Sequence, residues 1–291
     1  MNYLQFNDRG NFEPEEQALA NYFGEGNYVG FYKKHFIRDK FQITKDDFIS
    51  GDIDVMFHAM KRLGIEYFYN DYPKCLEPYL HRTVWEDTLG NVKRSMFGDL
   101  YFHDPVFIKP KDKLKRFTGF VLETIDDLYN CKGASDQTKV WCSEPVTFTS
   151  EFRCYFVDKE YQANILNELY VPNITLDTWV NPYTCCAIGS FKKEINEEDF
   201  YKVKDFIREE LLCMRDEMDL DRSDWVFYKG FPKAFTLDLG ILTTGEVALI
   251  EMNDAFSIGK YNGIDDETYA KFVITRWNEL KEGITYDNTK R

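Results

Sequence analysis

Residues 233–253, KAFTLDLGILTTGEVALIEMN, constrain the fold more than any other segment of the chain. Two apolar runs flank a turn at Gly245, and their alternation predicts an antiparallel hairpin. Glu251 and Asn253 share one face of the second strand because side chains repeat every two residues, and Asp238 of the first strand can lie opposite them. Burying such polar groups without partners is costly. Three oxygen-bearing side chains that converge on one hairpin suit Mg²⁺.

A fixed cation is expected further upstream. Lys109 ends the strand-like run VFIKP, where its ammonium group would be aimed and able to bind phosphate oxygens. The loop at residues 109–120, which contains Lys115, carries five basic residues in an otherwise acidic chain. It lacks the GxxxxGK[ST] pattern, so it is not a P-loop. The alternative is a solvent-facing lysine followed by a solvated basic loop.

The segment SEPVTFTSEFR, residues 143–153, places two glutamates around a turn that contains a proline. Glu144 and Glu151 are seven residues apart, and Arg153 lies two residues beyond Glu151. On a strand, that spacing puts Glu151 and Arg153 on the same face, where they could hold a ribose and a phosphate together. An exposed cross-strand ion pair is the competing interpretation.

Composition narrows the class of protein. The chain has 291 residues and a formal net charge of −14, which repels nucleic-acid backbones and tolerates a cationic or amine substrate, although the acidity could serve solubility alone. Its seven cysteines form no CxxC pair, so we expect reduced thiols in a reducing compartment. No signal peptide and no apolar run of membrane-spanning length is expected.

The remaining periodicity predicts helices mixed with strands, and therefore an α+β or α/β protein. Helices are expected at residues 53–64, 75–89 (broken near Pro78), 195–218 and 265–283. Strands are expected at residues 65–70 and 184–192, in addition to those that carry the polar motifs.

Five short motifs occur in a fixed order: FIKP, SEPV, SEFR, LDLG and IEMN. In this order they resemble the ATP-grasp superfamily, and the resemblance spans residues 106–262. The stretches DYPKCLEPYLHRTVWEDTL and KRFTGF are also similar to a poorly characterised branch of phage and bacterial ATP-grasp proteins. The resemblance implies an N-terminal α/β domain at residues 1–95 and an ATP-grasp domain at 96–291. The latter would hold ATP between lobes at residues 96–145 and 146–291.

The resemblance also implies a role for each motif residue. Lys109 and Lys115 would contact phosphates, Glu144 and the backbone of Val146 would form the adenine hinge, and Glu151 would hold the ribose. Asp238, Glu251 and Asn253 would bind Mg²⁺, usually as two ions. Arg153 would stabilise an acylphosphate, and Arg82 would receive a substrate carboxylate.

By the same resemblance, the expected activity is an ATP-dependent carboxylate–amine ligase that releases ADP and phosphate. A phosphotransferase and a nucleotide-binding host-interaction protein without catalysis are the alternatives. We expect a cytoplasmic protein of a bacterium or a phage-infected host, acting on small-molecule or peptide acids and amines. No nucleic acid or membrane is expected as a partner, and a homodimer is left open.

Overall fold

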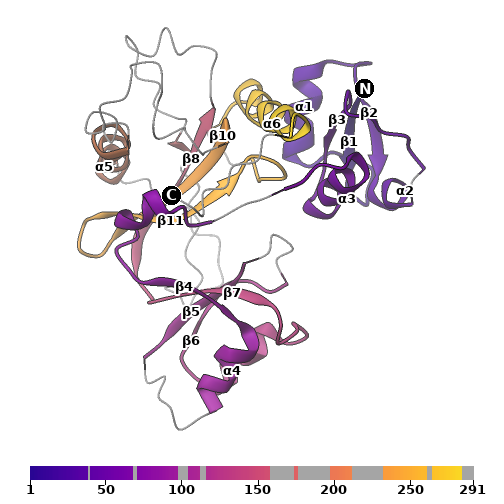
Figure 1. Cartoon of the computed structure of the whole chain (residues 1–291). Coiled ribbons are helices and arrows are strands. Elements are labelled where there is room, and N and C mark those ends of the chain that lie inside the picture. Colours follow the sequence, from indigo (N-terminus) through magenta and orange to yellow (C-terminus); the bar gives the residue numbers. More distant parts are fainter. Residues whose placement is uncertain are drawn as a thin grey trace.

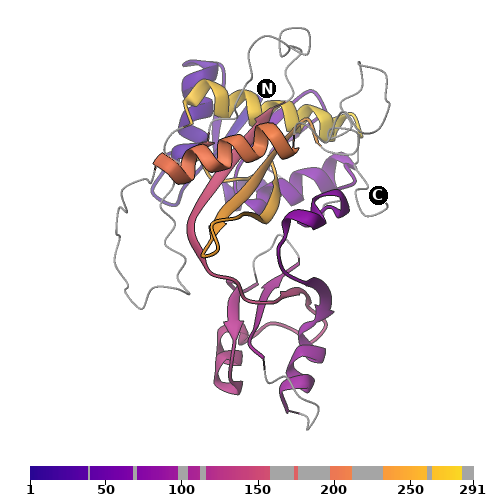
Figure 2. The same cartoon turned by 90° about the vertical axis from the view of Figure 1, so that its left-hand side faces the viewer.

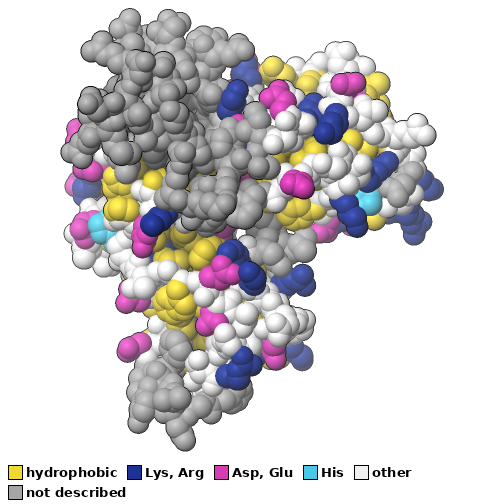
Figure 3. All heavy atoms as spheres, viewed as in Figure 1, with side chains coloured by type: hydrophobic (Ala, Val, Ile, Leu, Met, Phe, Trp, Pro, Cys, Tyr) yellow, Lys and Arg dark blue, Asp and Glu magenta, His cyan; other side chains and the backbone are white. Residues whose placement is uncertain are grey.

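The protein folds around three β-sheets, which Figure 1 and Figure 2 show from two directions. The structure is a computed structural model. It describes residues 1–38, 40–67, 71–97, 104–111, 116–157, 174–175, 197–211, 232–260 and 264–283. Within this part of the chain, no helix combines the length and the apolar composition that a membrane crossing requires. Acidic and basic side chains are interspersed over the surface that Figure 3 shows.

The first sheet is parallel and belongs to the N-terminal domain, with the strand order β2-β1-β3. Its elements in chain order are β1 (Asn2–Phe6), α1 (Pro14–Phe23), β2 (Val29–Tyr32), α2 (Lys33–Ile37), β3 (Phe48–Ser50) and α3 (Ile53–Leu63). The expected helix at residues 53–64 is confirmed. The Asp52 carboxylate accepts a hydrogen bond from the Val55 amide at the helix start, and Gly64 ends the helix in the left-handed conformation that glycine favours.

The second sheet is antiparallel, with the order β4-β7-β5-β6. Its segment contains η1 (Lys74–Tyr79), β4 (Val84–Thr88), α4 (Leu89–Phe97), β5 (Val106–Pro110), β6 (Phe120–Leu122), η2 (Ile125–Cys131) and β7 (Lys139–Ser143). The expected helix at 75–89 is wrong. Only a short 3-10 helix forms there, and Val84 and Trp85 enter a strand because β-branched and aromatic side chains fit a paired, half-buried surface.

The third sheet is also antiparallel, with the order β11-β10-β8-β9. It consists of β8 (Phe148–Val157), β9 (Ile174–Thr175), β10 (Ala234–Leu242) and β11 (Val247–Asp254), and its helices are α5 (Glu197–Phe206), a π-helical turn η4 (Ile207–Leu211) and α6 (Asp266–Lys281). The expected hairpin with Gly245 in its turn is confirmed.

The other expected elements have mixed outcomes. The expected C-terminal helix is confirmed as α6, and the helix expected at 195–218 is confirmed over residues 197–211. Its remainder and the strand expected at 184–192 lie outside the described residues. Residues 65–67 are not a strand, and the rest of that expected strand is likewise outside.

Packing joins the third sheet to the N-terminal domain. One apolar cluster contains residues of α1, α3 and the first sheet together with α6, so α6 lies between the two units (Figure 1). A second cluster fills the space between the third sheet, α5 and η1. The second sheet has its own core with α4 and η2. β4 and α4 precede residue 96 or span it, so this lobe draws on residues from both sides of the expected domain boundary.

Candidate active site

The second sheet presents one polar face. Glu86 of β4 and Lys109 of β5 both lie opposite Trp141 of the central strand β7. Side chains directly opposite each other share a face, and the intervening Ile108 and Cys142 point into the buried core of the lobe. Strand alternation alone therefore aims Lys109 out of its own lobe.

The third sheet presents a matching row of charges. Arg153 of β8, Asp238 of β10 and Glu251 of β11 lie opposite one another across three strands. The alternate residues Cys154 and Leu237 are fully buried on the other face. The expectation that these polar residues share one face of the hairpin is therefore met by the strand register.

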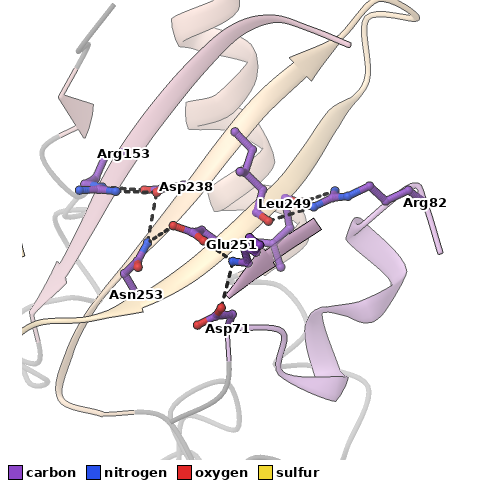
Figure 4. A network of polar contacts seen from close by, with 9 residues as sticks. Asp71, Arg82, Arg153, Asp238, Leu249, Glu251 and Asn253 are labelled. Carbon is purple, nitrogen blue, oxygen red and sulfur yellow. Dashed lines mark hydrogen bonds and ion pairs between the residues drawn. The ribbon is translucent and has the colours of Figure 1, made fainter. Parts of the chain in front are cut away.

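The side chains of this row contact one another directly (Figure 4). Arg153 donates from Nε and Nη2 to the two carboxylate oxygens of Asp238, each at 2.7 Å. The Asn253 amide nitrogen donates to Asp238 at 3.1 Å and to Glu251 at 2.9 Å. The three residues predicted as metal ligands thus lie together, held by hydrogen bonds.

Lys109 connects the two sheets. Its ammonium forms an ion pair with Glu251 of the third sheet and another with Asp71, at 2.9 Å. It also lies 4.7 Å from the centre of the Tyr72 ring. Burial acts to lower the pKa of Lys109, but Asp71 and Glu251 outweigh it and hold that pKa well above its ordinary value. The lysine therefore stays charged in a largely buried position.

Negative charge is in excess at this site. Burial, followed by the nearby carboxylates of Asp238 and Glu251, raises the pKa of Glu151 to about 7. Burial also raises the pKa of Asp238, against the opposing effect of Arg153. Four carboxylates face two cationic side chains, so the fully ionised cluster has two more negative than positive charges; its members are Asp71, Glu151, Asp238, Glu251, Lys109 and Arg153.

This donor set fits a hard divalent cation. Asp238 and Glu251 are close enough to share one amide donor, and oxygen ligands with surplus negative charge are what Mg²⁺ binds. Among the described residues, no group of three or more His, Cys, Asp or Glu side chains could hold a metal ion. The candidate set instead combines two carboxylates with the Asn253 amide.

The predicted hinge residues lie between the two sheets. Glu144 follows β7, is exposed, and accepts a hydrogen bond from the Thr83 amide at 2.7 Å. That bond lowers the pKa of the Glu144 carboxyl. Val146 is half-buried in the connection between β7 and β8. Lys115, the predicted second phosphate contact, lies outside the described residues.

Arg82 occupies a position that the sequence did not suggest. Its guanidinium donates to the backbone carbonyls of Leu80, Leu249 and Ile250, at 3.0, 2.7 and 2.9 Å (Figure 4). These bonds attach the segment before β4 to the strand that carries Glu251. The geometry favours a structural task for Arg82, and its predicted contact with a substrate carboxylate stays a prediction.

Two buried polar atoms also border this region. The Trp141 indole nitrogen, on the face that carries Lys109, has no hydrogen-bond partner in the described structure. The same is true of the Thr236 hydroxyl, which lies directly opposite Asn253. Sequence reasoning singled out neither residue, nor Asp71, because none of them stands in a recognisable motif.

Comparison with known proteins gives one family match. The model of an ATP-grasp domain, the second family of its clade, matches residues 79–164 and 226–272. These ranges contain every predicted site residue and exclude Asp71. A search of the curated proteins finds no match.

Solved structures similar to this chain include D-alanine–D-alanine ligases. The Bacillus anthracis enzyme is 12% identical, with 97% of each chain covered and a TM-score of 0.45. The Helicobacter pylori enzyme is 11% identical with a TM-score of 0.35, over 81% of this chain and 61% of that one, so this chain spans less than two thirds of its length. A RimK domain ATP-grasp protein from Sphaerobacter thermophilus is 10% identical, with coverage of 94% and 100% and a TM-score of 0.46.

Proposed function

Because this chain belongs to the ATP-grasp superfamily, we propose that it is an ATP-dependent carboxylate–amine ligase. ATP would phosphorylate a carboxylate, and an amine would then displace phosphate from the acylphosphate to form an amide, leaving ADP and inorganic phosphate. The observation that carries the proposal is the convergence of Lys109 from one sheet with Asp238, Glu251 and Asn253 from the other. Bringing cationic and oxygen-donor groups together suits phosphoryl transfer, which depends on positioning and charge neutralisation.

Each residue has a proposed task. Lys109 would bind phosphate oxygens, and Arg153 would stabilise the acylphosphate once its bidentate contact with Asp238 loosens. Glu151 would accept hydrogen bonds from the ribose. Asp238, Glu251 and Asn253 would hold Mg²⁺, which supplies charge neutralisation for the phosphates when bound. Glu144 and the Val146 backbone would border the adenine, and Lys115 would close over the phosphates.

We further propose that the substrates are a small-molecule or peptide acid and an amine. The excess of carboxylates at the site and the net charge of −14 support an amine-bearing partner over a nucleic acid. The described free cysteines, three of them buried, support the reducing environment of a cytoplasm.

The reaction is tested with wild-type protein, Mg-ATP and pooled acids and amines. We expect ADP, phosphate and condensation products one water lighter than the two inputs, identified by mass spectrometry. Hydroxylamine should trap the acylphosphate as a hydroxamate only when the acid is present. Stoichiometric AMP would exclude this reaction. A phosphorylated product that resists hydroxylamine would favour a phosphotransferase, and ATP binding with no product would favour a non-catalytic nucleotide-binding protein.

Two substitutions test the site itself. Lys109→Ala and Glu251→Ala should each lower turnover by about 100-fold or more, because each removes one preorganised electrostatic group. Asp136→Asn is the matched control, since Asp136 pairs with Lys93 at the surface and its side chain is 62% exposed. Near-normal turnover in a folded Lys109 or Glu251 variant would remove that residue from the proposed machinery.

A further inference from the structure

Asp71 is a buried carboxylate that the proposed reaction does not yet use. It lies just before η1, and its residue is 7% exposed. Its carboxylate lies 2.9 Å from the Lys109 ammonium, while its backbone carbonyl accepts a hydrogen bond of 2.9 Å from the Met252 amide. The backbone bond fixes Asp71 beside β11, and the side chain is thereby aimed at the lysine.

The segment from Asp71 to Arg82 runs along an open strand edge. β11 is the end strand of its sheet, so its outer carbonyls and amides need partners from elsewhere. Arg82 donates to the carbonyls of Leu249 and Ile250, and the Asp71 carbonyl accepts from Met252. The residue between these contacts is Glu251. The same attachments therefore place Asp71 and the proposed metal ligand on either side of Lys109.

Glu251 cannot serve Lys109 and a divalent cation equally. In the described structure its carboxylate pairs with the Lys109 ammonium. A cation bound at Glu251 would take up that carboxylate and repel the ammonium, because like charges at short range in a poorly solvated site interact strongly. Lys109 would then keep one carboxylate partner of the two, Asp71, together with the face of the Tyr72 ring.

We propose that Asp71 is a positioning residue for nucleotide binding, which holds the Lys109 ammonium in the cleft when Glu251 binds a cation. The inference rests on the proposed ATP-binding function and assigns a residue outside its motifs. Asp71 acts through the lysine and touches neither the nucleotide nor the metal. Its contribution should therefore vanish when the lysine is absent.

A double-mutant cycle tests this dependence. Calorimetry of Mg-ATP binding compares wild type, Asp71→Asn, Lys109→Met and the double variant, with Asp136→Asn as the control for removing a lysine-paired carboxylate elsewhere. The loss of a charged partner predicts about 10-fold to 100-fold weaker binding for Asp71→Asn. In the Lys109→Met background, the same substitution should change affinity by less than about twofold, because the two residues act as one unit.

The outcomes separate this inference from the proposed function. Equal losses from Asp71→Asn with and without the lysine would overturn it, as would an unchanged affinity in the single variant. A shift in Mg²⁺ dependence that survives Lys109→Met would also overturn it and make Asp71 a cation ligand. Wild-type protein that fails to bind Mg-ATP would overturn the function and the inference together. Circular dichroism confirms that each variant is folded.

Discussion

Arg276 of α6 offers the largest effect on stability that the structure predicts for one side chain. Its side chain and those of Asp254 and Glu279 are each 1% exposed. Arg276 donates to both oxygens of Asp254, at 2.8 and 2.9 Å, and to Glu279 at 2.9 Å. One guanidinium thus faces two buried carboxylates, so its removal leaves two negative charges without their cationic partner.

The magnitude follows from that count. Breaking a buried ion pair by removing one partner costs about 3–5 kcal/mol, because the remaining charge is poorly solvated. Arg276→Met keeps a long apolar stem and removes the charge, and we expect its free energy of unfolding to fall by about this amount. At a urea dependence of about 3 kcal/mol per molar, the midpoint should move down by about 1–1.5 M.

Urea unfolding followed by circular dichroism measures the change. Adding Asp254→Asn to Arg276→Met removes one of the stranded charges, so the double variant should regain about 1 kcal/mol or more. Lys271→Met is the matched control on the same helix, because its pair with Glu267 is exposed and worth less than about 0.5 kcal/mol. A loss below about 1 kcal/mol for Arg276→Met, or a further loss in the double variant, would refute the reasoning.

Two further predictions concern stability outside the site. Burial raises the pKa of Glu16 from 4.5 to about 7, so the folded state holds this proton over a pH range in which the unfolded state has lost it. Stability should fall as pH rises from about 4.5 to 7, and Glu16→Gln should remove about 2–3 kcal/mol of that dependence in urea midpoints measured across the range; parallel profiles would contradict it. A Cβ at Gly240 would lie 2.3 Å from the Phe148 ring, so Gly240→Ala should cost about 1–3 kcal/mol in thermal or urea unfolding. Phe148→Leu should relieve part of that cost, and strictly additive losses in the double variant would contradict the clash.

Local periodicity was sufficient for the parts of the site that lie on regular strands. The two-residue repeat places Glu251 beside Asn253 and aims Lys109 away from its own core, as the register then shows. The turn at Gly245 fixes the hairpin, so the predicted convergence with Asp238 needed no long-range information. These features could be predicted because each depends on residues close in sequence.

Contacts that depend on distant partners could not be predicted in the same way. The residues around 84–88 have a mixed pattern, and their pairing with β7 decides that they form a strand. Arg82 reads as a free cation in the sequence, yet its hydrogen-bond acceptor Leu249 is 167 residues away. Asp71 has no motif at all, and only the fold brings it to Lys109.

The position of Asp71 has a consequence for how the lobes respond to a ligand. Lys109 belongs to the second sheet, Glu251 to the third, and Asp71 to the connection from the N-terminal domain. Because Met252 and Arg82 attach that connection to β11, Asp71 cannot move away from Glu251 without breaking backbone-directed hydrogen bonds. A cation that displaces Lys109 from Glu251 therefore removes one of the two ion pairs that this lysine makes outside its own sheet. The surviving pair with Asp71 then becomes the pivot about which the lysine reorients toward phosphate.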